Sequence, residues 1–254
     1  MPNAQLAQQQ IAAFRRDGYL HLPAFCKTDE LLALADRLAA QAAPPLEYEA
    51  ETGYPGAPPS IDAPGGRTLR RLLGVYARHP LFQDHARDPR VLGLLSELLA
   101  PELMLSQAHH NCLMFKDPRY GSSTDWHQDI RYWRFARPDL ISSWLALNPA
   151  GPEGGCLYFV PGSHSMQFRA DQFDSEQQFF RTDTAENRAL LDQAVPIPLA
   201  AGDLVLFHSR LLHAATRNTT GVVRKSLIFT YHGADNAPEP GTRSAATLDV
   251  SLSE

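Results

Sequence analysis

Cysteine is scarce in this sequence, and its spacing excludes two kinds of protein. The 254 residues contain only Cys26, Cys112 and Cys156, and no two of them form a Cys-x-x-Cys pair. An odd number of widely separated thiols does not build a disulfide framework, and it offers no zinc site made of paired cysteines. We therefore expect three buried free thiols in a protein of a reducing compartment.

Excess positive charge and long apolar runs are also lacking. Lys and Arg number 23 against 28 Asp and Glu, which gives a formal net charge of −5 and no cationic surplus to hold a polyanion. No stretch approaches the roughly 18 apolar residues of a membrane span, and the first twenty residues contain no signal-peptide core. We expect a cytoplasmic protein, a monomer or a homodimer, that binds neither nucleic acid nor a membrane.

The length suits a single domain over 1–254, whose first part, 1–100, is expected to be mainly helical support. Apolar spacing predicts a helix over 4–17 and a second helix that begins with Thr28 as its cap. After the second helix, 44–66 is rich in proline and glycine, which predicts a flexible loop of the kind that often covers a pocket.

From residue 101 onwards the pattern changes to short strands. β-branched and aromatic residues concentrate in segments separated by Pro, Gly and Asp, namely 103–116, 140–148, 155–160, 195–207 and 222–232. Such a series predicts an all-β core with added helices: a double-stranded β-helix, or cupin-like jelly-roll barrel, with the N-terminal helices packed on one sheet. The core would span 101–235 with a partly helical insertion at 165–194, and 236–254 would form a C-terminal tail.

A His-x-Asp triplet is the first candidate for chemistry. His127 and Asp129 are two residues apart, so in an extended segment both side chains leave on one face, while Gln128 points elsewhere. A sequence of this composition contains roughly one such triplet by chance, so the triplet needs support. The buried strand 204–207 is followed by His208 and His213, either of which could complete two histidines and one carboxylate, the set that leaves three positions open on Fe(II).

Arg224 decides between the two histidines. A 2-oxoglutarate that chelates iron presents a second carboxylate, which requires a permanently charged, fork-shaped donor inside the core. Arg224 lies 11 residues beyond His213, enough for a turn and a return on the neighbouring strand, so we choose His213 as the third ligand. Ser226 shares a strand face with Arg224 and could donate a hydrogen bond to the same carboxylate.

Four motifs in order carry a resemblance to a known family. WHQD, Trp144 within DLISSWLAL, GGCLYFVPGSH and GDLVLFHSRLLHAATRNTTGVVRKS span 127–226, and QIAAFRRDGYLHLPAF precedes them near the start. The sequence resembles the phytanoyl-CoA dioxygenase family of Fe(II)/2-oxoglutarate oxygenases. The resemblance implies the cofactors Fe(II), 2-oxoglutarate and O₂, and hydroxylation of a C–H bond in a small organic substrate with release of succinate and CO₂.

The resemblance also implies roles for individual residues. Iron would lie on His127, Asp129 and His213, the distal carboxylate of 2-oxoglutarate on Arg224, and further cosubstrate contacts on Gln128 and Trp144. One position departs from the family, which often has Ser where this chain has Ala215, so Thr216 or Ser226 would have to replace that hydrogen bond. Retention of Asp129 favours hydroxylation over halogenation, because halogenating relatives have a small residue there that leaves room for halide.

Substrate clues come from cations and rings near the triplet. The segment 131–137 (RYWRFAR), together with Arg70 and Arg71, could grip an anionic or aromatic substrate, or it could be a solvated loop whose arginines stack on its own rings. No dense Lys/Arg run marks a coenzyme A site. We interpret the pair His109 and His110 as an edge feature, and we assign neither of them, nor His164 or His208, to iron.

Two alternatives to the oxygenase remain at this point. A cupin-like metalloenzyme could use the same three ligands without 2-oxoglutarate, although an interior Arg224 argues against it. A catalytically silent jelly-roll module could bind a small molecule in the pocket, although intact ligands argue against that.

Overall fold

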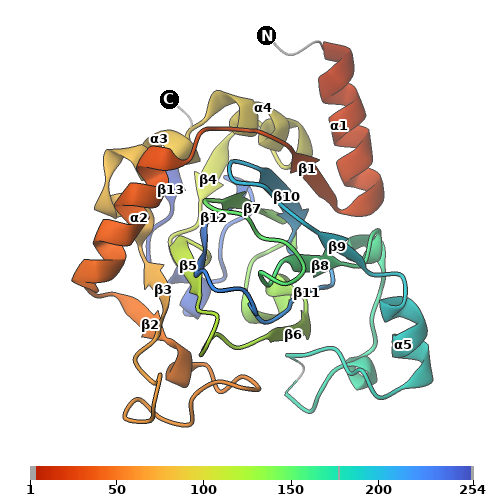
Figure 1. Ribbon diagram of the computed structural model, residues 1–254. Helices are drawn as coiled ribbons and strands as arrows, with labels where there is room; N and C mark the ends of the chain where they lie inside the picture. The colour runs from red at the N-terminus through yellow and green to blue at the C-terminus, as the bar shows by residue number, and fades with distance from the viewer. Residues whose placement is uncertain (1–3, 177, 253–254) are drawn as a thin grey trace.

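Two antiparallel sheets face each other in this computed structural model, which describes residues 4–176 and 178–252 (Figure 1). The large sheet runs in the order β1-β10-β7-β12-β5-β3-β2, with β4 paired to β12 and β13 paired to β4. Its strands are β1 (Tyr19–Leu22), β2 (Leu46–Tyr48), β3 (Leu69–Leu73), β4 (Leu103–Leu105), β5 (Cys112–Lys116), β7 (Leu140–Ala146), β10 (Leu204–His208), β12 (Arg224–Gly233) and β13 (Val250–Ser251). The small sheet, in the order β6-β11-β8-β9, contains β6 (Thr124–His127), β8 (Leu157–Phe159), β9 (Val195–Ile197) and β11 (His213–Ala215).

The predicted jelly roll is confirmed, but the expected barrel is not closed. No strand of the large sheet pairs with a strand of the small sheet within the described part of the chain. The two sheets meet through side chains instead. Trp144 and Phe207 from the large sheet pack against Leu157 and Phe159 from the small one, so apolar contact between the sheets replaces the hydrogen bonds of a continuous barrel.

Helices cover the outer face of the large sheet, as predicted (Figure 1). These helices are α1 (Ala4–Asp17), α2 (Asp29–Gln41), α3 (Pro80–Ala86) and α4 (Pro89–Leu98). The fifth helix, α5 (Ala185–Leu191), lies apart from them in the insertion. Successive residues of β12 alternate between the two sides: Leu227 and Phe229 join the core beneath the helices, whereas Ile228 joins the core between the sheets. Burial on both faces explains why these strands contain near-continuous apolar runs.

Three expectations for the ends of the chain need correction. Thr28 precedes α2, but its side chain makes no capping hydrogen bond. Residues 44–66 are not irregular throughout, because β2 pairs with β3, and Glu49 is buried against Arg70. The expected tail at 236–254 contains β13, which extends the large sheet at β4. In the loop and in the tail, pairing with a distant segment decides the local structure.

The loop 44–66 and the insertion 165–194 lie on either side of β6 at the bottom of the view in Figure 1. The insertion is partly helical, as predicted, because it contains α5. The two segments meet where the ring of Tyr54 lies 5.5 Å from the ring of Phe179 in an edge contact. The loop 44–66 and the insertion are therefore in contact beside the end of β6.

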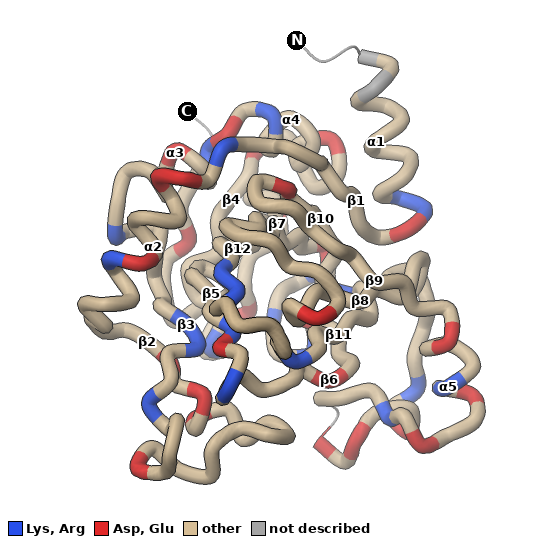
Figure 2. Tube along the Cα trace, viewed as in Figure 1, with Lys and Arg blue, Asp and Glu red and all other residues tan. Residues whose placement is uncertain are grey.

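Charge is spread over the molecule without a single-sign surface along the trace (Figure 2). Positions of Lys and Arg alternate with positions of Asp and Glu around the loops and helices. No helix in the described ranges is long and apolar enough to cross a membrane.

Acid should destabilise the fold through His85 of α3. Burial lowers the pKa of His85 from 6.5 to about 4, and its ring lies 6.3 Å from the rings of Phe25 and Phe229. The neutral ring is the form that fits the folded protein, so its contribution is complete above pH 6.5 and is lost as the pH falls to about 4. We expect the free energy of unfolding to fall by about 3 kcal/mol across this range through His85 alone.

Urea unfolding at several pH values measures this loss. His85→Leu should flatten the acid slope, because the variant has no ring to protonate in the unfolded chain. An equally steep slope in the native protein and in the variant would assign the acid sensitivity to other groups.

Candidate metal centre

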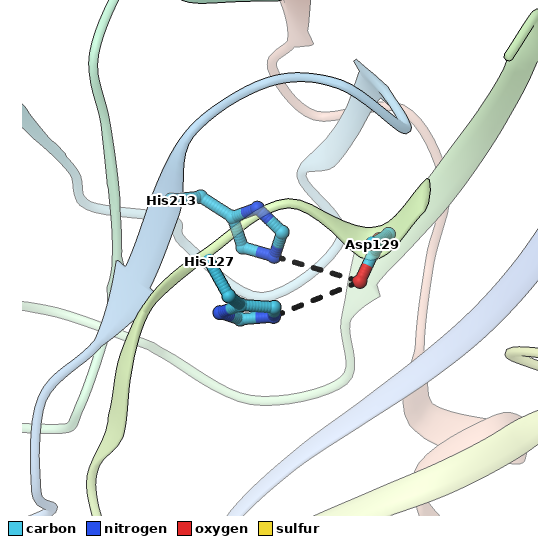
Figure 3. Close-up of side chains that lie close together, drawn as sticks. All are labelled: His127, Asp129 and His213. Atoms are coloured by element: carbon cyan, nitrogen blue, oxygen red, sulfur yellow. Dashed lines mark ion pairs between the residues drawn. The ribbon is translucent and has the colours of Figure 1, made fainter. Parts of the chain in front are cut away.

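Three buried side chains converge at the ends of strands β6 and β11 (Figure 3). One potential ligand atom from each of His127, Asp129 and His213 lies within 4.8 Å of the other two. Oδ1 of Asp129 is 3.7 Å from Nε2 of His127 and 3.9 Å from Nε2 of His213. The histidines are direct cross-strand partners, and Asp129 begins the short 3-10 turn η3 (Asp129–Tyr132) just after β6 ends.

Backbone carbonyls orient both histidine rings. Nδ1 of His127 lies 2.8 Å from the carbonyl oxygen of Asp125, and Nδ1 of His213 lies 2.9 Å from that of Leu211. A carbonyl only accepts, so Nδ1 must carry the proton and donate it. Nε2 then offers a lone pair toward Asp129, which is the tautomer that binds a metal ion.

The protonation states also suit a cation. Burial, followed by the neighbouring His127, lowers the pKa of His213 to about 4, so this ring is neutral at pH 7. Burial alone would raise the pKa of Asp129, but His110, His213 and His127 hold it below its usual value. A buried carboxylate whose neighbours are histidine rings lacks a permanent counter-charge, and a divalent cation would supply one.

His208, which we did not assign to iron from the sequence, lies outside this group of three side chains. Its Nδ1 accepts the backbone N–H of Arg210 at 3.0 Å, and its ring faces that of His164 at 5.5 Å. Of these histidines only His213 joins His127 and Asp129 among the described residues.

His110 is a neighbour of the centre that the sequence analysis missed. Its Nδ1 lies 3.6 Å from Oδ2 of Asp129 and 3.3 Å from Oγ of Ser142. Oδ2 is buried and accepts no hydrogen bond from the described part of the chain. The expectation of an edge feature is therefore wrong, because His110 faces the oxygen of Asp129 that points away from the two histidines. No sequence signal separates His110 from His109, whose Nε2 instead contacts Ser244 Oγ at 2.7 Å.

Arg224 lies fully inside the core, on the inward face of β12. Its Nη1 donates to the carbonyl of Gly155, but Nε and Nη2 are buried without a hydrogen-bond partner in the described ranges, as is Oγ of Ser226. Burial, then repulsion from Arg70, lowers the pKa of Arg224 to about 10. A cavity joins this guanidinium to the three convergent side chains, with Trp144 in its wall 5.1 Å beneath the guanidinium carbon. Unpartnered buried donors of this kind are costly unless an anion accepts from them.

Lys116 adds a second cation that the sequence did not reveal. It is the cross-strand partner of Arg224, and its Nζ donates to the carbonyls of Thr216 at 2.6 Å and Ala215 at 3.4 Å. Burial, then repulsion from Arg224, lowers its pKa well below the usual value. Thr216 itself is occupied elsewhere, since its hydroxyl donates to Pro152 O at 3.3 Å.

Gln128 is not brought to this cavity. Its side-chain amide donates to the carbonyl of Arg210, and it lines a separate surface pocket with Arg131 and Arg134. The reason is strand alternation, because the residue between His127 and Asp129 points to the other side of the chain. The spacing of the triplet predicted that Gln128 points away from His127 and Asp129. The cosubstrate contact that the resemblance implied for Gln128 stays a prediction.

Part of the segment 131–137 lines a cavity beside the metal ligands, and part of it stacks an arginine on a ring. Tyr132 and Trp133 line a cavity together with His127 and Asp129. The guanidinium carbon of Arg131 instead lies 3.1 Å over the ring of Phe173, away from the three convergent side chains.

The family is decided by comparison with known proteins. A profile of the phytanoyl-CoA dioxygenase (PhyH) family matches residues 14–226, most of the chain. The chain belongs to this family. It is therefore an Fe(II)- and 2-oxoglutarate-dependent dioxygenase that consumes O₂, as the resemblance implied, and neither the silent binding module nor the enzyme without 2-oxoglutarate is retained.

Relatives within and near the phytanoyl-CoA dioxygenase family cover most of the chain. The ectoine dioxygenase of Stutzerimonas stutzeri (strain A1501) is 25% identical over 252 residues, which are 93% of this chain and 80% of the relative. The non-heme alpha ketoglutarate dependent epimerase SnoN from nogalamycin biosynthesis has a TM-score of 0.75 at 25% identity and covers 94% of this chain and 88% of its own. EvdO2 from Micromonospora carbonacea var. aurantiaca, solved with 2-oxoglutarate, has a TM-score of 0.63 at 25% identity, with coverage of 91% and 94%.

The choice of His213 over His208 can be tested by metal binding. Anaerobic titration with Co(II), whose visible absorption reports its ligands, should give one tight site in the native protein. We expect His213→Ala to weaken it by at least about a hundredfold, because one of three protein ligands is lost, and His208→Ala to bind as the native protein does. Tight binding by His213→Ala together with loss in His208→Ala would reverse the assignment.

His110 should support metal binding through Asp129. The ring of His110 lies 3.6 Å from the carboxylate oxygen that faces away from the two histidines, so it can restrict the orientation of Asp129. Neighbours that orient a metal ligand contribute roughly 10- to 100-fold to metal affinity. In the same titration His110→Leu should fall in this range, whereas the matched variant His109→Leu should change the affinity by less than about threefold. Equal effects of the two variants would indicate a general loss of packing.

Proposed function

We propose that this family member holds Fe(II) on His127, Asp129 and His213, holds 2-oxoglutarate through Arg224, and hydroxylates a C–H bond of a small anionic or aromatic molecule. One observation carries the assignment of the site. A buried guanidinium with two unpartnered nitrogens shares a cavity with three convergent ligand side chains. A metal-chelating diacid satisfies both ends of such a cavity at once.

The donor set suits Fe(II). Two neutral imidazoles and one carboxylate on one side of a metal ion leave the other positions to a bidentate cosubstrate and O₂. A site closed by four protein ligands would leave fewer open positions, and no fourth ligand residue joins the group in the described chain. Asp129 fills the position that halide would need, which supports hydroxylation over halogenation.

The far end of the cavity suits the distal carboxylate of 2-oxoglutarate. Nε and Nη2 of Arg224 can donate side by side to two carboxylate oxygens, and Ser226 Oγ, on the same strand face, can donate a third bond. Ser226 is a better substitute for the serine missing at position 215 than Thr216, whose hydroxyl is already bonded to Pro152. Lys116 is the cross-strand partner of Arg224, and Trp144 excludes water beneath the guanidinium.

The reaction conserves all atoms. A substrate R–H, 2-oxoglutarate and O₂ give R–OH, succinate and CO₂, with one oxygen atom in the alcohol and the other in succinate. Bound iron and 2-oxoglutarate supply the oxidising chemistry. The residues of this chain position the two ligands and, through the apolar contacts of Trp144 and Phe207, keep water from the cavity.

A coenzyme A thioester is not the proposed substrate. The cavity beside His127 and Asp129 has a volume of about 360 Å³, near the lower end of small-molecule sites. One relative is an ectoine dioxygenase, and one structural neighbour is an epimerase from nogalamycin biosynthesis. The cytoplasmic location and the monomeric or homodimeric state remain predictions from the sequence.

Arg224 can be tested without knowledge of the substrate. The anaerobic Fe(II) protein titrated with 2-oxoglutarate should develop a visible charge-transfer band, and Arg224→Met should raise the Kd by at least about tenfold, because hydrogen bonds to a charged group are lost. Arg217→Met, which removes an exposed arginine of the same segment, is the matched control. Pyruvate has no distal carboxylate, so its affinity should not depend on Arg224. A change of less than twofold for 2-oxoglutarate would contradict the assignment of its anchor.

Product analysis tests the type of reaction. A metabolite screen for substrate-stimulated succinate release, followed by mass spectrometry, should find a product that has gained one oxygen atom. An unchanged substrate mass would instead indicate an epimerisation like that of the structural neighbour SnoN.

A further inference from the structure

A second cavity opens onto the centre, and it shares Arg71, His127 and Asp129 with the cavity that contains Arg224. It is lined by His127 and Asp129, by Tyr54 of the loop 44–66, and by Arg71, Tyr132 and Trp133. A molecule in this cavity would lie against two of the three proposed iron ligands. Under the proposed function this is the place of the primary substrate.

Flat side chains form part of its wall. The ring of Tyr132 lies 6.1 Å from that of His127, and the ring of Trp133 meets that of His110 edge-on at 5.2 Å. The hydroxyl of Tyr132 is buried and has no hydrogen-bond partner in the described ranges. The wall therefore combines ring surfaces with one free polar group, an arrangement that suits a planar ligand with a polar substituent.

Two adjacent arginines of β3 have different surroundings. Arg70 donates from Nη1 to Glu49 at 3.2 Å and to Ser122 at 2.8 Å, and from Nη2 to Thr124 at 3.3 Å. Arg71 makes no hydrogen bond within the described part of the chain, and its Nε is only 3.6 Å from Oε1 of Glu47. Glu47 lies closer to Arg70, at 3.2 Å. Arg70 is therefore part of the fold, whereas the fork of Arg71 is available to a ligand.

The acidic groups of the same cavity are already engaged. Glu47 is shared between Arg70 and Arg71, and Oε2 of Glu51 accepts the backbone N–H of Tyr48 at 2.6 Å. A cationic ligand would have to compete with these contacts. An anionic ligand would instead meet the guanidinium of Arg71, which is paired with Glu47 at 3.6 Å but makes no hydrogen bond within the described residues.

We propose that the primary substrate carries a carboxylate or a similarly shaped anionic group that binds Arg71, next to a flat ring that packs on Tyr132 and Trp133. This inference rests on the proposed function and specifies its substrate. Arg71 determines specificity by anchoring the anion, which fixes the rest of the molecule beside His127 and Asp129. The volume of about 360 Å³ limits the body of the substrate to a small ring system.

Three probes of one shape and different charge test the anion. Anaerobic protein loaded with Fe(II) and saturating 2-oxoglutarate is titrated with phenylacetate, phenylacetamide and 2-phenylethylamine, by calorimetry and by the change in the charge-transfer band. We expect phenylacetate to bind at least about tenfold more tightly than the amide, and the amine most weakly. Arg71→Met should reduce the preference for the carboxylate to less than about twofold, and Arg71→Lys should retain part of it.

Arg67→Met is the matched control, because Arg67 is exposed just before the same strand. It should keep the full preference, and melting temperatures identify any variant that does not fold. The proposal is overturned if the amide or the amine binds as tightly as phenylacetate, if phenylacetate does not bind in the millimolar range, or if Arg71→Met keeps the preference while Arg243→Met, at the cavity rim, removes it.

The charge-transfer band recorded before any probe is added distinguishes failure of the Arg71 proposal from failure of the proposed function. A normal band without an anion preference rejects only the role of Arg71. An absent band in the native protein rejects the proposed function itself.

Discussion

Side-chain alternation along β12 is the constraint on which both the fold and the site depend. The strand is buried on two sides, so it must present Leu227 and Phe229 to the helices that cover the large sheet. The same pleat turns Arg224 and Ser226 inward, where two guanidinium nitrogens and the serine hydroxyl are buried without a hydrogen-bond partner among the described residues. The strand cannot keep its helical layer without also burying this guanidinium. An anion in the cavity offsets the resulting loss of solvation, which links the stability of the core to occupancy of the site.

The metal centre depends on strand register in a comparable way. His127 and His213 are direct partners across β6 and β11, so the backbone hydrogen bonds of the small sheet bring the rings within 4.1 Å of each other. Each ring is also held by a carbonyl two residues before it in the chain. The ligands therefore converge through backbone geometry alone. The chain turns out of β6 immediately afterwards, and this turn places Asp129 opposite both histidines.

Much of this arrangement could be predicted from the sequence because it is local. The strands beyond residue 101 show as short apolar runs, and the His-x-Asp triplet brings two ligands together by spacing alone. β3 was missed because its sequence, LRRLL, places two charges in a strand that is partly buried, and those charges are tolerated only through Glu47 and Glu49 of another segment. Lys116 and His110 were missed for the same reason. Each gains its significance from a partner far along the chain, and periodicity carries no information about such partners.

Arg70 and Arg71 are adjacent on β3, but Arg70 holds the fold together whereas Arg71 is proposed to bind the substrate. Successive residues of β3 point to different surroundings, so Arg70 can bond to Glu49 while Arg71 remains unbonded. Glu47 and Glu49 both come from the loop 44–66. Contacts that hold this loop therefore use the hydrogen bonds of Arg70 and leave those of Arg71 free to form with a ligand. The loop therefore has two effects on the pocket. It covers the pocket, and because it accepts hydrogen bonds from Arg70 but not from Arg71, it leaves the guanidinium of Arg71 able to donate to a substrate beside the metal ligands.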